Sequence, residues 1–142
     1  MSFWDSSAIV PLCVNEDRSQ AALRLWRSFS ERYVWRETSV EVESVFARLN
    51  REGVFDAIQL RKAQSRFLLV EKEWSFVERS DLSIELARTF PVTYGLKALD
   101  CLQLAAALVW CKEFPKNKDF VSADTRLSKA AESAGFTVHY LV

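Results

Sequence analysis

The sequence predicts an α/β fold with a mainly parallel central sheet and helices on both of its faces. Short apolar segments of strand character alternate along the chain with longer segments whose apolar residues have helical spacing. Such alternation is typical of parallel sheets, in which a helix connects one strand with the next. The chain has 142 residues, 49% of them hydrophobic, enough for one domain with a core and short for two. We therefore expect a single domain over residues 1–142.

The first quarter of the chain predicts two strands separated by helix. Residues 2–5 form an apolar segment that ends in an acid, as expected of a buried strand with a carboxylate at its C-terminal tip. Residues 6–11 indicate a turn and a short helical stretch, and 16–31 have helical spacing. Residues 33–35 are the second strand candidate.

Two helices and a third strand follow. Thr38 and Ser39 are suitable caps for a helix that Gly53 ends. Residues 56–73 predict another helix, with strand-like residues 74–77 after it. We expect that helix to bury Ile58, Phe67, Leu68 and Val70.

The last third of the chain repeats the alternation. A helix over 81–90 is expected to close before Pro91, with a loop over 91–95. A long apolar helix around residues 96–110 comes next. The remaining elements are a strand over 119–123, a helix over 125–134 that Gly135 stops, and a strand over 136–142.

Composition limits the function classes. Lys plus Arg number 19 and Asp plus Glu number 19, so the formal net charge is zero. A basic field over the whole chain, which would favour nucleic-acid binding, is absent, although a local basic rim remains possible. The three cysteines are odd in number and form no CxxC, which indicates reduced thiols and neither a zinc site nor a disulfide framework. With no leader-like or membrane-length apolar segment, we expect a cytoplasmic protein.

Asp100 is the most informative residue, because it lies inside the apolar segment 96–110. An unpaired buried carboxylate costs several kcal/mol, so such a group is normally paired, protonated or bound to a cation. A salt bridge to Lys97 is the simplest alternative explanation.

Three further acids occupy suitable positions. Asp5 and Asp124 follow predicted strands, and ligands of such sheets bind beyond the carboxyl ends of the strands. Glu41 lies in a predicted helix, with Glu43 about 200° further round it as the competing candidate. Either aspartate could instead cap the helix that follows it. Divalent cations prefer carboxylate oxygens, so together the four acids favour a metal site.

Other chemistries lack their residues. With only three glycines, at 53, 95 and 135, no dinucleotide-binding or Walker phosphate loop can be built. Asp5 is followed by Ser6 and Ser7, so the DxD opening of hydrolases with an aspartyl nucleophile is absent. The only histidine, His139, lies in the last strand, where a structural role is favoured over a catalytic triad.

Four segments resemble the PIN domain, and within it the VapC-like ribonuclease toxins of type II toxin–antitoxin systems. They are residues 4–8 (WDSSA), 38–48 (TSVEVESVFAR), 99–107 (LDCLQLAAA) and 121–127 (VSADTRL). The resemblance runs from residue 3 to about 138, and Phe46 and Cys101 are mild departures from the usual Leu and Ala. It implies a three-layer α/β/α fold around a mainly parallel sheet of four to five strands.

The resemblance also implies roles. Asp5 and Asp100 would be the principal ligands of Mg²⁺ or Mn²⁺, and Glu41 and Asp124 the remaining acids, which hold a second ion or orient the attacking water. Glu41 is preferred to Glu43 because it stands three residues after Thr38, as in the family. Ser7 and Ser122 would support the pocket. Basic side chains at its rim could hold phosphates, with ordinary solvated charge as the alternative: Lys97, Lys112, Lys116, Lys118 or Arg126.

The implied function is a metal-dependent endoribonuclease that hydrolyses RNA phosphodiesters as the toxin of a toxin–antitoxin module. The implied partners are RNA, a cognate antitoxin and a second copy of the chain, with no membrane. Two alternatives stay open: a catalytically weak RNA-binding or assembly partner of the same fold, and a nuclease of the same fold acting on DNA or in housekeeping RNA processing. The four acids favour the enzyme, and the compact length favours the toxin.

Overall fold

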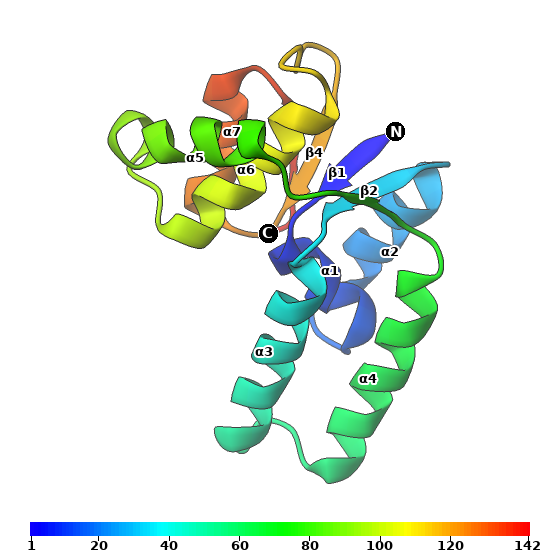
Figure 1. Ribbon diagram of the computed structural model, residues 1–142. Helices are drawn as coiled ribbons and strands as arrows, with labels where there is room; N and C mark the ends of the chain where they lie inside the picture. The colour runs from blue at the N-terminus through cyan, green and yellow to red at the C-terminus, as the bar shows by residue number, and fades with distance from the viewer.

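The computed structural model describes all residues from Met1 to Val142 and contains five strands and seven helices (Figure 1). In chain order they are β1 (Ser2–Trp4), α1 (Ser6–Cys13), α2 (Ser19–Ser28), β2 (Arg32–Trp35), α3 (Thr38–Arg51), α4 (Ala57–Glu71), β3 (Ser75–Val77), α5 (Asp81–Tyr94), α6 (Ala98–Trp110), β4 (Asp119–Ser122), α7 (Thr125–Ala134) and β5 (Thr137–Tyr140). The predicted α/β class is confirmed. None of the helices combines the length and apolar character needed to cross a membrane.

The five strands form one parallel sheet in the order β3-β2-β1-β4-β5. The chain builds the sheet outward from β1 to β3 and then returns to the other side of β1 to add β4 and β5. The direction of the order therefore reverses between β1 and β4. In open parallel sheets such a switch point is where ligands bind, beyond the carboxyl ends of the two strands.

Side chains alternate between two cores because successive residues of a strand point to opposite faces. Phe3 of β1 and Phe120 of β4 pack with α5, α6 and α7 on one face. Trp4 and Val121, the next residues, pack with α1 to α4 on the other. These two apolar layers on either side of the sheet confirm the predicted three-layer arrangement.

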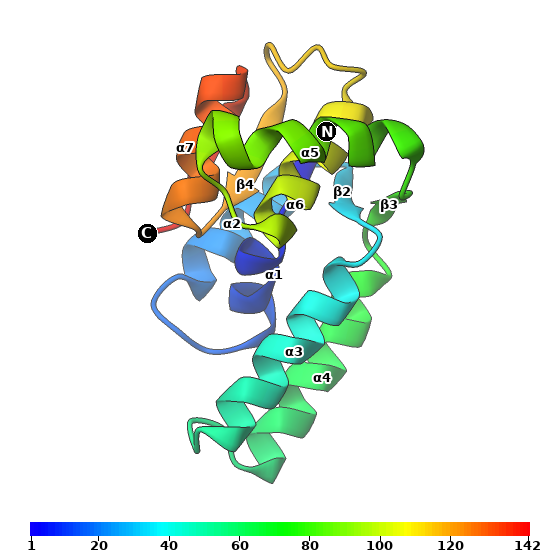
Figure 2. The same ribbon diagram turned by 60° about the vertical axis from the view of Figure 1, so that its left-hand side comes forward.

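Helices α3 and α4 lie side by side and project from the rest of the molecule as an arm (Figures 1 and 2). Because the arm is two helices thick, much of its surface faces solvent. Ile58 and Leu68 are 57% and 63% exposed, so their predicted burial is wrong, whereas Phe67 is buried. At about 100° per residue, the nine positions from Ile58 to Phe67 place their side chains on opposite sides of α4. The side chain of Leu68 points about 100° away from that of Phe67.

Two further details differ from the prediction. Helix α5 continues through Pro91 to Tyr94 and ends at Gly95, whose φ of 65° is left-handed, so the loop predicted over 91–95 is wrong. A proline removes one backbone donor, and the rest of the turn still forms. Neither Thr38 nor Ser39 caps α3, because both belong to the helix and their hydroxyls contact Gln103 and Glu71 instead.

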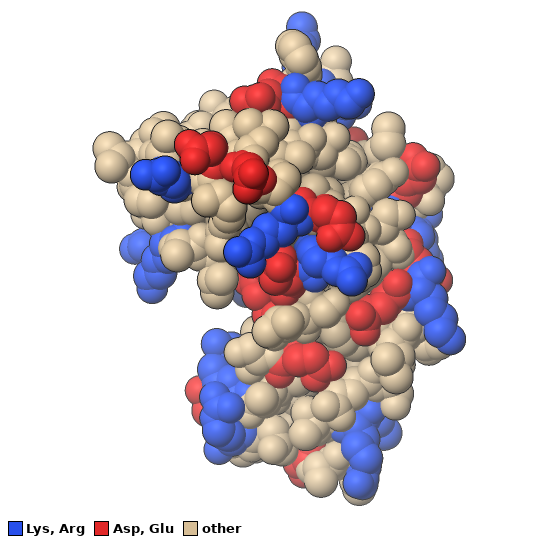
Figure 3. Space-filling model, viewed as in Figure 1, with Lys and Arg blue, Asp and Glu red and all other residues tan.

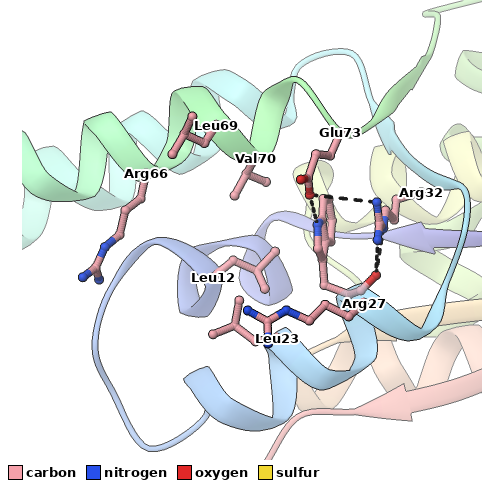
Figure 4. Close-up of a pocket in the computed structure, with 9 residues that line it drawn as sticks. Leu12, Leu23, Arg27, Arg32, Arg66, Leu69, Val70 and Glu73 are labelled. Atoms are coloured by element: carbon pink, nitrogen blue, oxygen red, sulfur yellow. Dashed lines mark hydrogen bonds and ion pairs between the residues drawn. The ribbon is translucent and has the colours of Figure 1, made fainter.

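A cavity of about 370 Å³ lies between α1, α2 and α4 (Figure 4). Trp26 Nε1 donates to Glu73 Oε2 at 2.6 Å, and Arg32 stacks on the Trp26 ring at 4.7 Å. The other walls are mostly apolar, formed by Leu12, Leu23, Leu69 and Val70 with the side chains of Arg27 and Arg66. None of the four predicted site acids lines this cavity. Its contacts join α2 to the end of α4.

Candidate active site

The site begins at the switch point of the sheet. Asp5 directly follows β1, and Asp124 follows β4 after one intervening residue. Because β1 and β4 are adjacent and parallel, with Trp4 opposite Val121, their carboxyl ends lie together. The short parallel strands therefore bring together two acids that are 119 positions apart in the sequence, as predicted from the alternation of elements.

Asp5 is a buried carboxylate without a positively charged partner. It is only 2% exposed and takes part in no ion pair. Although it precedes α1, its side chain makes no capping bond to that helix. The pKa of Asp5 is raised from 3.8 to about 7: desolvation by burial is the largest cause, the hydrogen bond from Ser7 opposes it, and the charges of Glu41, Asp100 and Asp124 add to it.

Two serines connect Asp5 with the end of β4. Ser7 Oγ lies 2.7 Å and 3.1 Å from the two carboxylate oxygens of Asp5, and it also accepts from the backbone N–H of Ala123 at 2.9 Å. Ser122 Oγ lies 3.4 Å from Ser7 Oγ and accepts from the N–H of Asp124 at 3.0 Å. Both predicted supporting residues thus lie between the two strand ends, holding Asp5 and the turn before Asp124.

Glu41 enters the site from the first turn of α3. Ser6 donates to its Oε2 at 3.1 Å, and the amide of Gln103 donates to its Oε1 at 2.7 Å. Burial raises the pKa of Glu41, Gln103 and Ser6 oppose that shift, and Asp100 and Glu37 add to it. The competitor Glu43 is exposed and contacts Gln64 of α4 instead. Of the two glutamates, only Glu41 shares the site with Asp5.

Asp100 lies in the first turn of α6 and is partly buried, so it stands at the end of the apolar helix. Burial raises its pKa, the Asp124 charge adds to this, and Lys97 and Arg126 oppose it. No ion pair joins it to Lys97, so the salt bridge considered as the simplest alternative is not formed. The lysine lowers the repulsion at the site without neutralising the carboxylate.

Asp124 does cap a helix. Its Oδ1 accepts from the backbone N–H of Leu127 at 2.8 Å, in the first turn of α7. One carboxylate oxygen of Asp124 is therefore bonded to the helix, while the negative charge of Asp124 still acts on Asp5 and Asp100. The capping explanation therefore holds for Asp124 and fails for Asp5.

The four acids form one electrostatic cluster. Each stands at or within the first turn of a different helix, where the helix dipole favours negative charge. Even so, burial and mutual repulsion raise the pKa of Asp5, Glu41 and Asp100. Negative charge that the protein leaves uncompensated in a partly buried site is what a hard cation offsets.

The donor set fits a cation that retains other ligands. No group of three His, Cys, Asp or Glu side chains is arranged to hold a metal ion by itself. Mg²⁺ is usually bound by one or two carboxylates together with waters and substrate phosphates, so it does not require such a cage. Asp5 and Asp100, with Glu41 and Asp124 beside them, are the residues that would hold it.

The basic residues divide into two groups. Lys97 and Arg126 act on Asp100 and so belong to this end of the sheet. Lys112, Lys116 and Lys118 precede β4, at the edge where the parallel strands begin, and are therefore not at the rim of the site. Figure 3 shows acidic side chains gathered where the α3–α4 arm meets the rest of the molecule, with basic side chains beside them.

Gln103 is a site residue that the sequence reasoning missed. It lies on α6 one turn after Asp100 and is buried beside Glu41. The available signal was a further polar residue, three positions after Asp100, in the part of the apolar segment that is otherwise without polar residues. Ser6, the donor to the other Glu41 oxygen, had no such signal, because serines are common at helix starts.

Several known proteins share this fold. A family model described as PIN domain matches residues 3–133. A chain from a toxin–antitoxin complex of Klebsiella pneumoniae superimposes with a TM-score of 0.61 at 16% identity, over 88% of either chain. The crystal structure of PAE2754 from Pyrobaculum aerophilum gives a TM-score of 0.69 at 14% identity, over 99% of this chain and 88% of that one. No curated protein sequence matches. Since the family model spans nearly the whole chain, the protein belongs to the PIN domain family.

Proposed function

We propose that the protein is a divalent-metal-dependent endoribonuclease and the toxin of a toxin–antitoxin module. The observation that carries the proposal is the Asp5 carboxylate, buried among three other acids with no cationic side chain paired to it. A protein that used this region only for packing would be more stable with a neutral residue there. PIN domains are generally nucleases, which supports hydrolysis of a phosphodiester over other uses of such a cluster.

Each acid has a proposed role. Asp5 and Asp100 are the principal ligands of Mg²⁺ or Mn²⁺, while Glu41 and Asp124 complete the negative site and orient the attacking water. Ser7 and Ser122 hold Asp5 and the end of β4 in place through the contacts described above. When bound, the cation supplies Lewis-acid stabilisation of negative charge on the phosphate. Lys97 and Arg126 are the basic residues placed to attract the RNA backbone.

The toxin role has separate support. One of the structural neighbours comes from a toxin–antitoxin complex, and the likeness covers most of both chains. We further propose a cognate antitoxin that covers the acidic site, and a homodimer as the assembled form. An antitoxin could block the site by placing a basic side chain among the acids, since the cluster attracts positive charge.

Cleavage of total RNA by the purified, partner-free protein tests the proposal. We expect discrete fragments with Mg²⁺ or Mn²⁺, none with EDTA, and none from the Asp5→Ala variant run beside it to expose contaminating nuclease. Single- and double-stranded DNA in parallel reactions test the preference for RNA. A folded protein that binds Mn²⁺ and cuts none of these would contradict catalysis and favour a binding role for the same fold.

A further inference from the structure

Gln103 is a polar side chain in a place that favours an apolar one. It is 1% exposed and is followed on α6 by the buried run Leu104 to Leu108. Burying a carboxamide is unfavourable unless its hydrogen bonds are made, and an apolar side chain of similar length would suit the surrounding core. A residue of this kind therefore calls for an explanation from its contacts.

Both contacts of the Gln103 amide go to the start of α3. Its Nε2 donates to Glu41 Oε1 at 2.7 Å and to Thr38 Oγ1 at 3.1 Å. Its Oε1 is buried and has no partner, so the side chain is only partly satisfied. An unsatisfied buried acceptor is destabilising. The orientation of the amide is thus set by Glu41 and Thr38 and by nothing on its other side.

The chemistry of the donor matters for the charge of Glu41. An amide is neutral, so it stabilises a carboxylate through hydrogen bonding without cancelling its charge, whereas a lysine or arginine would form an ion pair. The second oxygen, Glu41 Oε2, contacts only Ser6, a neutral hydroxyl on the residue that follows Asp5. Glu41 is therefore held at both oxygens by neutral donors, and no positively charged side chain pairs with it beside Asp5 and Asp100.

We propose that Gln103 is a positioning residue for Glu41: it fixes the orientation of that carboxylate toward the cation site and leaves its charge free to act there. The inference rests on the proposed function, because it assigns Gln103 a part in the same metal site. It acts through Glu41 and does not contact the cation or the RNA. Groups that orient metal ligands in this way typically affect metal affinity by about 10- to 100-fold.

The test is Mn²⁺ affinity, measured by calorimetric titration without RNA, in a double-mutant cycle of Gln103→Met and Glu41→Gln. We expect Gln103→Met alone to weaken Mn²⁺ binding by about 10-fold, and to change it by less than about 2-fold when Glu41→Gln is already present. A purely structural effect on α6 would weaken binding in both backgrounds. Gln103→Leu serves as a second replacement if the methionine variant folds poorly.

Ser128→Ala is the matched control, since it removes a buried hydroxyl on α7 that has no hydrogen-bond partner and makes no hydrogen bond to Glu41. It should leave the Mn²⁺ affinity unchanged. Two outcomes would show that the positioning role is wrong while the metal site stands. In the first, the unsubstituted protein binds Mn²⁺ and Gln103→Met binds it equally well. In the second, Gln103→Met weakens Mn²⁺ binding just as much in the Glu41→Gln background. If the unsubstituted protein binds no Mn²⁺, the proposed metal site fails and the positioning role with it.

Discussion

Asp5 and Asp124 have the same local pattern and different physical situations. Both stand at the carboxyl end of a parallel strand and immediately before a helix, and the two strands are neighbours. Asp124 bonds to the backbone of its helix and is partly exposed, whereas Asp5 makes no capping bond and is buried. The strand–Asp–helix pattern thus serves helix capping in one case and leaves a destabilising charge in the other. The excess negative charge at Asp5 is the better indicator of a binding role.

The largest expected difference between the two residues is in catalysis. Residues that support the ligands of a metal site typically change metal affinity or activity by about 10- to 100-fold when they are replaced. Asp5 is a proposed direct ligand, so we expect Asp5→Asn to lower the rate of RNA cleavage by more than about 100-fold. Asp124→Asn keeps the cap and loses the charge, and it should lower the rate of RNA cleavage by about 10- to 100-fold. Initial rates with saturating Mg²⁺ measure both. Near-normal cleavage by Asp5→Asn would remove Asp5 from the site.

Stability should depend on pH through Asp5 in a defined direction. Between the ordinary pKa of 3.8 and the folded value of about 7, the folded protein keeps a proton that the unfolded chain has released. The free energy of unfolding therefore falls as pH rises through this window and is level above it. At 1.36 kcal/mol per pKa unit, the full change is about 4 kcal/mol.

The pH effect is isolated by subtracting variants. Glu41 and Asp100 have raised pKa values too, so they add changes of the same sign to the wild-type curve. In EDTA, urea titrations of wild type and Asp5→Asn from acid to neutral pH should therefore diverge, with the variant increasingly the more stable. A constant difference across this range would mean that Asp5 is not desolvated as described.

Ser7→Ala should separate the support of Asp5 from its charge. The substitution removes both contacts to the carboxylate and leaves the buried N–H of Ala123 without its acceptor. Loss of a partner to a buried group costs about 1–3 kcal/mol, so urea titration at pH 7.5 should show a drop of that size. Because the Ser7 bond lowers the pKa of Asp5, the pH window of instability should also extend upward. An unchanged stability would show that water replaces the hydroxyl.

The smallest effect concerns the cap of α7. Asp124→Ala removes the bond to Leu127 N–H, and N-cap replacements of this kind cost about 1 kcal/mol. Asp124→Asn can keep that bond, so its stability should stay within a few tenths of the wild-type value. Thermal melting in EDTA compares the two. Equal losses in both variants would mean that the charge of Asp124, and not its capping bond, stabilises the helix.

The sequence predicted the order of the elements and the end of the sheet where the acids meet, because short apolar segments that alternate with segments of helical spacing indicate a parallel sheet. It misplaced features that depend on which neighbours a segment meets. The burial of Ile58 and Leu68 could not be judged without knowing that α3 and α4 form a projecting arm. Helix α5 continues through Pro91 because a proline removes only one backbone donor, and it ends at the left-handed Gly95.

Within the site, the sequence indicated the acids and missed what orients them. Asp100 drew attention through its place in an apolar segment, although it lies at the first turn of α6 and is only partly buried. Gln103, in the same segment, is the more deeply buried of the two and contacts a residue 62 positions away. Contacts of that kind depend on how the start of α3 meets α6 beyond the carboxyl ends of the strands, which no local pattern encodes.

The most direct test of the metal site is the melting temperature of wild type and Asp5→Asn at pH 7.5, each in EDTA and in millimolar Mn²⁺. A ligand that binds only the folded state raises the melting temperature, and a buried uncompensated charge lowers it. We predict that Asp5→Asn melts above wild type in EDTA, and that Mn²⁺ raises wild type and leaves the variant unchanged. Equal responses of the two proteins to Mn²⁺, or no response of wild type, would contradict a cation site built on Asp5.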